Sequence, residues 1–209
     1  MEGRDAMRRR HRAVTVLAVV AAVLTAGAAA SVASAAGQAG KVTQAGKVTL
    51  HSTRVFSGPQ TIVAGPDGAL WYTNRIGNSI GRMTTSGHAK SAFHAPSIKR
   101  PAGIAAGPDG ALWFTNNFGN SIGRITASGK VTNYTGTGIS GPEGITAGPD
   151  GALWFANSEG NSIGRITTAG RVTTYPAPRA DTPNRIVTGP DGAMWFTTDR
   201  GQIGRITTP

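Results

Sequence analysis

Several features are missing from this sequence of 209 residues, and each absence excludes a class of protein. There is no cysteine, so disulfide bonds do not hold the fold together. No Ser-His-Asp set, glycine-rich phosphate loop or zinc-ligand spacing occurs. The repeated units described below nowhere place apolar residues at the 3.6-residue spacing of an amphipathic helix. What remains points to a β protein without a catalytic motif that can be read directly.

Tryptophan is scarce, but it is regularly placed and marks a repeat. The four Trp residues, at positions 71, 113, 154 and 195, follow one another at steps of 42, 41 and 41 residues. Each lies in a motif seen most clearly at 107–115 as Gly-Pro-Asp-Gly-Ala-Leu-Trp-Phe-Thr and followed by Ile-Gly-Arg-Ile-Thr. A period near 40 residues, with strand-forming residues and turns, is typical of propeller blades. The repeat therefore predicts an all-β fold, a four-bladed β-propeller of four-stranded blades.

The second unit shows the expected strands of a blade. Residues 103–107 form the inner strand, and residues 111–116, 121–127 and 130–135 form the strands outside it. Asp109 and Gly110 supply the positive φ that a tight hairpin turn needs. The apolar residues do not alternate cleanly, which fits blades stacked face to face with both faces buried. Each Trp is expected between blades. Turn chemistry explains the turn aspartates, and blade packing together with an outward-facing charge explains the Gly-Arg pairs.

The fourth unit stops after its third strand, at residues 202–207, so its outer strand is missing. Residues 47–52 match the outer strand of later units but follow no blade of their own. Since a closed ring leaves no exposed sheet edge, we expect the N-terminal strand to close the last blade within one chain. Two alternatives stay open. Two chains exchange these strands, which gives a dimer instead of a monomer, or the chain is part of a larger ring.

Residues 1–35 have the pattern of a secretory signal peptide. A basic run at 8–12 precedes an apolar stretch at 13–24, and Ala33-Ser34-Ala35 fits the small-residue cleavage rule. The apolar stretch is short for a membrane span of about 20 residues, so export and cleavage are favoured over an anchor. Residues 36–45 read as a flexible linker and 46–209 as the propeller domain. We therefore expect a secreted protein that is not held in a membrane after cleavage.

The net charge of +11 does not indicate nucleic-acid binding. Much of the surplus lies in the leader or recurs once per repeat, whereas a nucleic-acid footprint is a clustered patch. A small-molecule or cell-surface ligand is the expected partner.

The repeated motif resembles the blades of the virginiamycin B lyase (streptogramin lyase) family over residues 46–209. The resemblance implies a β-propeller and a Mg²⁺-assisted elimination that opens the ester linkage of cyclic depsipeptide antibiotics of the streptogramin B type. In the family, a His base and metal-binding carboxylates lie at the channel mouth. This sequence differs from the family at the positions that match that His, where no unit has a histidine, and it has four repeats where the family has close to seven.

The order of strands in a blade predicts which residues meet at this mouth. Loops that enter inner strands share one face with loops between second and third strands. The candidate ligand-binding residues on this face are Gln60, Arg75, Asn117, Glu159, Asn184, Arg185 and Arg200. Glu143 is the candidate catalytic or metal-binding carboxylate, because Mg²⁺ sites use one or two carboxylates with waters. The turn aspartates at the opposite end would not serve as cation sites, since Asp before Gly is explained by the turn.

Histidine offers few candidates for a general base. His94 ends the outer strand of the first unit and His51 lies in the N-terminal strand, whereas His88 is a turn residue and His11 belongs to the leader. A base must reach its proton within hydrogen-bond distance or through one water. Either His94 or His51 could be the base if its loop folds over the mouth, and His94 is the candidate retained. The sequence thus leaves two functions open, a lyase of the streptogramin type and a non-catalytic exported propeller that binds a ligand, a glycan or a protein.

Overall fold

A computed structural model of the chain describes residues 46–209. The leader predicted at 1–35 and the linker predicted at 36–45 lie outside the described residues. Residues Leu50–Pro209 form one compact unit, and the four β-sheets found within residues 46–209 lie in it. In the part of the chain that is described, no helix has the length and apolar character that a membrane crossing requires.

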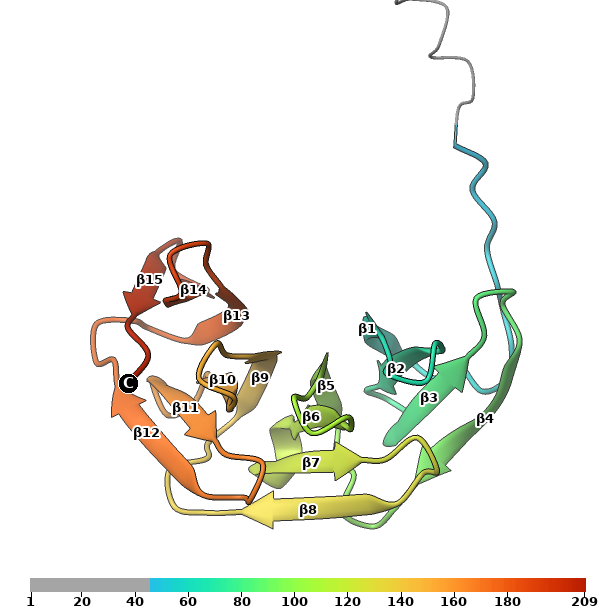
Figure 1. Cartoon of the computed structure of the whole chain (residues 1–209), viewed down its shortest axis with the longest axis horizontal. Coiled ribbons are helices and arrows are strands. Elements are labelled where there is room, and N and C mark those ends of the chain that lie inside the picture. Colours follow the sequence, from blue (N-terminus) through green and yellow to red (C-terminus); the bar gives the residue numbers. More distant parts are fainter. Residues whose placement is uncertain (1–45) are drawn as a thin grey trace, which may run out of the picture. The chain divides into compact units, whose positions relative to one another are not determined.

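The unit consists of four antiparallel sheets, each a simple meander of consecutive strands (Figure 1). The first blade contains β1 (Pro59–Ala64), β2 (Leu70–Asn74), β3 (Ser79–Met83) and β4 (Ala89–His94). The second contains β5 (Pro101–Ala106), β6 (Leu112–Asn116), the 3₁₀ helix η1 (Asn117–Gly119), β7 (Ser121–Ile125) and β8 (Val131–Thr135). The third contains β9 (Pro142–Ala147), β10 (Leu153–Asn157), β11 (Ser162–Ile166) and β12 (Val172–Pro176). The fourth contains β13 (Pro183–Thr188), β14 (Met194–Thr198) and β15 (Ile203–Ile206). The all-β architecture of four successive blades is confirmed; three blades have four strands, and the last has three.

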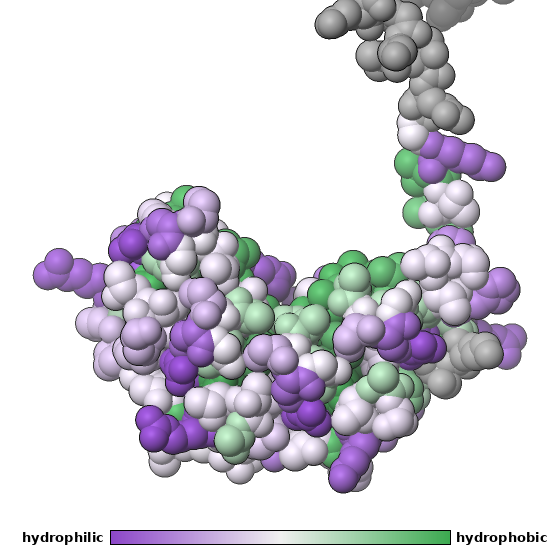
Figure 2. Space-filling model, in the orientation of Figure 1, coloured by the Kyte–Doolittle hydropathy of each residue, from purple (hydrophilic) through white to green (hydrophobic). Residues whose placement is uncertain are grey.

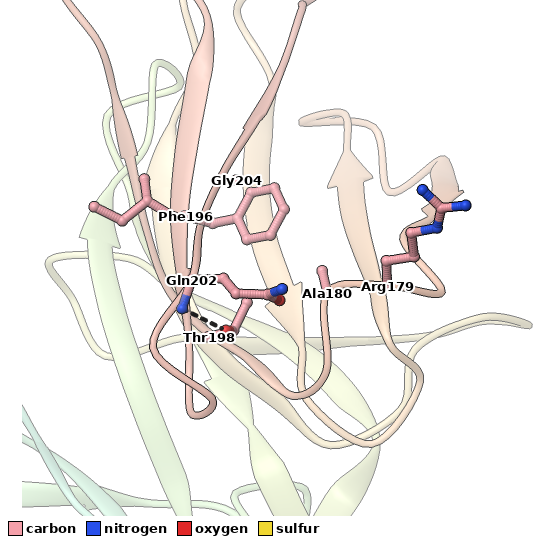
Figure 3. Close-up of a pocket in the computed structure, with 7 residues that line it drawn as sticks. Arg179, Ala180, Phe196, Thr198, Gln202 and Gly204 are labelled. Carbon is pink, nitrogen blue, oxygen red and sulfur yellow. Dashed lines mark hydrogen bonds between the residues drawn. The ribbon is translucent and has the colours of Figure 1, made fainter.

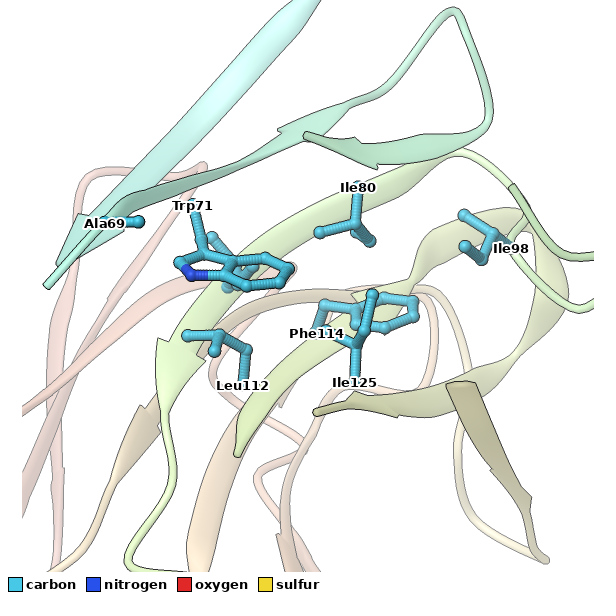
Figure 4. Close-up of a cluster of buried hydrophobic side chains, with 8 residues drawn as sticks. Ala69, Trp71, Ile80, Ile98, Leu112, Phe114 and Ile125 are labelled. Atoms are coloured by element: carbon cyan, nitrogen blue, oxygen red, sulfur yellow. The ribbon is translucent and has the colours of Figure 1, made fainter. Parts of the chain in front are cut away.

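The core lies between neighbouring blades, as the sequence predicts. Trp71 and Ile80 of the first blade face Leu112, Phe114 and Ile125 of the second (Figure 4). The same arrangement recurs between the second and third blades and between the third and fourth. Each buried Trp also stacks on an aromatic residue of the outer strand of its own blade, with ring centroids 5.2–5.4 Å apart. The repeat therefore encodes the blade-to-blade interface itself.

An Asp-Trp-Arg contact at the turn end of each blade corrects one sequence interpretation. In the second blade, Asp109 accepts a hydrogen bond from the indole Nε1 of Trp113 at 2.9 Å and an ion-paired one from Arg124 Nε at 2.6 Å. The other three blades repeat this contact. The recurrent arginines are therefore not simply outward-facing charges. Their spacing from the Asp and the Trp was visible in the sequence and is the signal that could have revealed the contact.

The inner strands β1, β5, β9 and β13 lie side by side in chain order, and the blades of Leu50–Pro209 form an open arc (Figure 1). The blades approach closely where glycine permits it, since a β-carbon at Gly103 would meet the carbonyl oxygen of Glu143 in the next blade. The first and last blades do not cover each other. Ile62 on the first blade is therefore 57% exposed, and Val187 on the last blade is 58% exposed. Figure 2 shows apolar surface on these two blades along the gap between them.

Closure of the last blade by the N-terminal strand within one chain is not what the structure shows. Residues 46–58 contain no strand, and the sheet of β13, β14 and β15 has three strands. The physical reason is the open arc, since the edge of β15 is reached only when the first blade closes on the fourth. Trp195 is consequently half-buried, whereas the Trp residues of the other three blades are fully buried.

Candidate ligand-binding site

The candidate site lies at the end of the blades where each inner strand begins. The pairing of the inner strand with the second strand is irregular there in every blade, for example between Pro101 and Ile104. Irregularities of this kind re-aim side chains and are common beside functional sites. Gln60, Glu143 and Asn184 occupy the same place in this irregular segment of three different blades.

Arg75 connects three blades at this end. Its guanidinium Nη1 lies 3.1 Å from Oε1 of Gln60 and 3.3 Å from Oε1 of Glu143, and its Nη2 lies 3.2 Å from Oδ1 of Asn117. The side chains of Arg75 and Glu143 are mostly buried, 23% and 14% exposed. The structure thus brings together four of the residues that the topology placed on this face.

The reach of Arg75 from the first blade to the third depends on the blade between them. Ala102 occupies in the second blade the position that Gln60 and Glu143 occupy in the others, and it is fully buried. Its short side chain leaves the space above it free for the guanidinium. The carbonyl of Glu143 is held in addition by the hydroxyl of Thr115, which donates a hydrogen bond of 2.6 Å. The carboxylate of Glu143 is therefore carried on a well-fixed backbone.

The remaining candidates do not join this cluster. Asn184 donates to Asp199 at 2.6 Å, within the fourth blade, and Arg200 pairs with Asp181 at the exposed end of that blade. Arg185 is exposed, and Glu159 is exposed in the loop between β10 and β11. The predicted face therefore separates into a network around Arg75 and a second group on the fourth blade.

The described histidines lie away from the network. His94 is exposed at the end of β4, the outer strand, where it pairs with Ser79. His88 is exposed in the turn before β4. His51 lies against Gly87 in the same turn, since a β-carbon at Gly87 would collide with its imidazole. None of these positions lies at the start of an inner strand, where the substrate-facing base of the family was expected.

The described residues of one chain do not fit a Mg²⁺ site. Within residues 46–209, no group of three or more His, Cys, Asp or Glu side chains lies close enough together to hold a metal ion. The carboxylate of Glu143 is engaged by Arg75 instead. A hard cation needs several oxygen ligands, and this network offers one carboxylate with a guanidinium beside it.

The pKa shifts in the structure belong to the opposite end of the blades. Burial alone raises the pKa of Asp67, Asp109 and Asp150, but hydrogen bonds from the neighbouring Trp and Arg outweigh it and lower the pKa of each. For Asp191, hydrogen bonds from Trp195 and Arg205 lower the pKa to about 2. These carboxylates are structural anions that fix the turns through their Trp and Arg partners.

The chain is similar to several known proteins. A family model described as the virginiamycin B lyase family matches residues 18–209, a range that begins inside the predicted leader. The structure resembles virginiamycin B lyase from Staphylococcus aureus, with 38% sequence identity, 80% of this chain and 61% of that chain covered, and a TM-score of 0.69. It also resembles a catalytically inactive histidine-to-alanine variant of that enzyme with quinupristin, with 41% identity, 72% and 56% of the chains covered, and a TM-score of 0.64.

A structure described as streptogramin B lyase matches equally well, with 38% identity, 78% of this chain and 59% of that chain covered, and a TM-score of 0.68. No significant match was found among curated protein sequences. The chain spans about three fifths of the length of these solved relatives. On the match over residues 18–209 and the identity to the solved lyases, the chain belongs to the virginiamycin B lyase family.

Proposed function

We propose that this protein is an exported, virginiamycin B lyase-like protein that acts on cyclic depsipeptides of the streptogramin B type. The observation that carries the proposal is the 38% identity to the S. aureus enzyme over 80% of the chain. A related structure contains quinupristin, which makes a compound of that class the first ligand to test. The face that carries Arg75 and Glu143 is the proposed binding face.

The network around Arg75 suits the product of such a reaction. In an elimination that opens an ester, a base removes a proton, the bond from carbon to the ester oxygen breaks, and a carbon-carbon double bond forms. The ester oxygen leaves as part of a carboxylate, and the proton stays on the base. A guanidinium binds a carboxylate through two parallel hydrogen bonds. Arg75 would receive this carboxylate in exchange for Glu143, which balances its charge beforehand.

A second candidate is a propeller outside the cell that binds a ligand, glycan or protein without changing it. It is favoured by the position of the described histidines, which lie on outer strands and turns. It is also favoured by the lack of a metal-ligand group within residues 46–209. This candidate predicts binding at the same face with no product.

One assay separates the two candidates. The purified protein is incubated with a type B streptogramin, with Mg²⁺ or with EDTA, and the antibiotic is analysed by chromatography and fragmentation mass spectrometry. Elimination gives a linear product of unchanged mass with a new double bond, whereas hydrolysis adds the mass of one water. Calorimetry on the same samples measures binding.

Three variants locate the site. Arg75→Gln should reduce turnover or binding about tenfold, which corresponds to about 1.4 kcal/mol. Glu143→Gln removes the carboxylate that competes for Arg75 and should strengthen binding of the linear product. The matched control is His88→Ala, in an exposed turn away from the face, which should leave both unchanged. If neither product nor binding is found with any type B streptogramin, the first candidate is wrong, and only a propeller that binds a ligand of another class is left.

A further inference from the structure

The first and last blades of the arc carry complementary halves of the interface that the other blades form with each other. On the free side of the fourth blade, Val187 and Ile203 are 58% and 72% exposed, and Trp195 lies between them. Their equivalents in the second blade, Ala105, Trp113 and Ile122, are buried against the third blade. The free side of the fourth blade thus has the residues of an interface without its partner.

The free side of the first blade has the matching half. Ile62 is 57% exposed there and corresponds to Ile104, which is buried against the first blade's Trp71. Leu70 corresponds to Leu112, which belongs to the same buried cluster. A first blade laid on a fourth blade would therefore repeat the apolar part of a contact that this chain already makes three times. Arg185 stands where the second and third blades have Gly103 and Gly144 against the next blade.

A threonine hydroxyl on the fourth blade also lacks the partner that its equivalents have in the next blade. Thr73 donates to the carbonyl of Ala102 in the next blade at 2.8 Å, and Thr115 donates likewise to Glu143. Thr197 is the equivalent residue in the fourth blade. Its hydroxyl oxygen accepts a hydrogen bond from the backbone N–H of Arg185, but its hydroxyl proton has no acceptor within residues 46–209. By the repeat, the missing acceptor is the carbonyl of Gln60 in another first blade.

The segment around His51 supplies the strand that the fourth blade lacks. The steps from His51 to Phe93, Tyr134 and Tyr175 are 42, 41 and 41 residues, the same as the steps between the tryptophans. Phe93 and Tyr134 lie against the turn glycine of the following blade, and His51 lies against Gly87 in the same way. His51 therefore already occupies the place of an outer-strand aromatic residue that precedes the first blade.

The register of the other blades tells where this segment would pair. The third strand and the outer strand pair as Ile80 with Phe93, Ile122 with Tyr134 and Ile163 with Tyr175. The same register places His51 opposite Ile203 and stacks its imidazole on Trp195. It also places Leu50, which is 88% exposed, opposite Gly204.

A groove on the fourth blade fits this leucine. It has a volume of about 330 Å³ and is lined in part by Ala180, Phe196 and Gly204 (Figure 3). Ala180 stands where the second and third blades have Ile98 and Ile139 against their phenylalanines. At the position of Leu50 the other outer strands have the smaller residues Ala92, Asn133 and Thr174. The smaller residue on the blade and the larger one on the strand compensate each other.

We propose that two copies of this chain close one eight-bladed ring, in which the first blade of each copy packs on the fourth blade of the other. Residues 47–52 of each copy form the outer strand of its partner's last blade. Eight blades lie within the usual range for propellers, and the ring leaves no free sheet edge. The two contacts are identical and head-to-tail, and they close by two-fold symmetry. At each of the two seams, the single mouth then includes Arg185 of one copy beside Gln60 of the other, so the binding face is completed by the partner copy.

Cysteine pairs test the contact directly, because the chain has no cysteine of its own. The gene is expressed in an exporting host, and intact mass gives the N-terminus of the purified chain. His51→Cys and Ile203→Cys are produced separately, mixed and oxidised. Directly opposed positions on paired strands lie within disulfide reach. The expected product is a covalent dimer with one chain of each kind.

The matched control pairs His51→Cys with Phe118→Cys, a position that is 67% exposed on the second blade and away from both free sides. This mixture should give at least tenfold less covalent dimer. If only the double variant His51→Cys/Ile203→Cys reacts, and it forms an internal disulfide, the strand closes its own chain and the proposal is wrong.

Solution mass is the second readout, and it does not depend on the proposed enzymatic function. Light scattering at micromolar concentration should give twice the mass of the chain. Ile203→Asp should weaken association about tenfold or more, because it buries an unpaired carboxylate in the contact, and should leave the circular dichroism unchanged. Phe118→Asp should remain dimeric. A monomeric mass for the unaltered chain would overturn the proposal, whatever the antibiotic assay shows.

Discussion

The guanidinium of Arg75 in the first blade lies 3.3 Å from the carboxylate of Glu143 in the third. This contact crosses a whole blade and joins residues that are far apart in the sequence. It is possible because Ala102 fills the equivalent position between them. The contact links the first blade to the third at the end where the inner strands begin.

The coupling between Arg75 and Glu143 is measurable. We expect Glu143→Gln to lower the free energy of unfolding by about 1 kcal/mol or less, because the pair is only partly buried. A double-mutant cycle with Arg75→Met, which keeps much of the side-chain bulk, should give a coupling of the same sign that shrinks as salt is added. Urea unfolding of the four proteins gives the number. Additive effects at low salt would show that the pair does not couple the blades.

The tryptophans of the second and fourth blades should differ in their contribution to stability. Trp113 is fully buried and stacks on Tyr134, so Trp113→Ala should cost roughly 3–5 kcal/mol. Trp195 is half-buried, so Trp195→Ala should cost about half as much. The comparison is made by urea unfolding in the Ile203→Asp background, at a protein concentration where light scattering gives the mass of one chain. Equal losses there would contradict the open fourth blade.

The fold could be predicted from the sequence because each blade is a local meander. The period, the Asp-Gly turns and the positions of Trp113 and its equivalents were enough to give the order of strands and the location of the core. Strand ends differ from the prediction by one or two residues, as between 103–107 and β5 at Pro101–Ala106. These ends depend on hydrogen-bond pairing that a pattern of residue types does not specify.

The candidate site was harder to predict, for a physical reason. Repeat positions tell which face a side chain lies on, but not how far a long side chain reaches. Arg75 was expected on the same face as Gln60 and Glu143, but its hydrogen bonds to these two residues, in two different blades, could not be derived from that placement. The sequence also could not tell how the ring closes. The match between residues 47–52 and the missing outer strand is compatible with a ring made by one chain or with two chains that exchange strands.

Acid should weaken the fourth blade through Asp191. Its pKa is lowered from the ordinary value of 3.8 to about 2 by hydrogen bonds from Trp195 and Arg205. A carboxylate whose pKa is lower in the folded state stabilises the fold above its ordinary pKa, and this contribution is lost as the pH falls towards the folded value. The loss of stability in Asp191→Asn should therefore be full at neutral pH and should vanish near pH 2. Urea midpoints of both proteins across this range test it, and a difference that stays constant with pH would exclude the assignment.

The third blade lacks one hydrogen bond that its neighbours have, and this gap suggests a stabilising substitution. Thr73 and Thr115 each donate to a carbonyl of the next inner strand, whereas the equivalent position in the third blade is Ala156. The carbonyl oxygen of Asn184 approaches Gly144 just as that of Glu143 approaches Gly103, so the acceptor is already in place. Ala156→Thr should raise the free energy of unfolding by about 0.5–1.5 kcal/mol, the net value of one such bond. Ala156→Val, which has nearly the same shape without the hydroxyl, is the matched control, and a gain of the same size in both variants would assign the effect to packing alone.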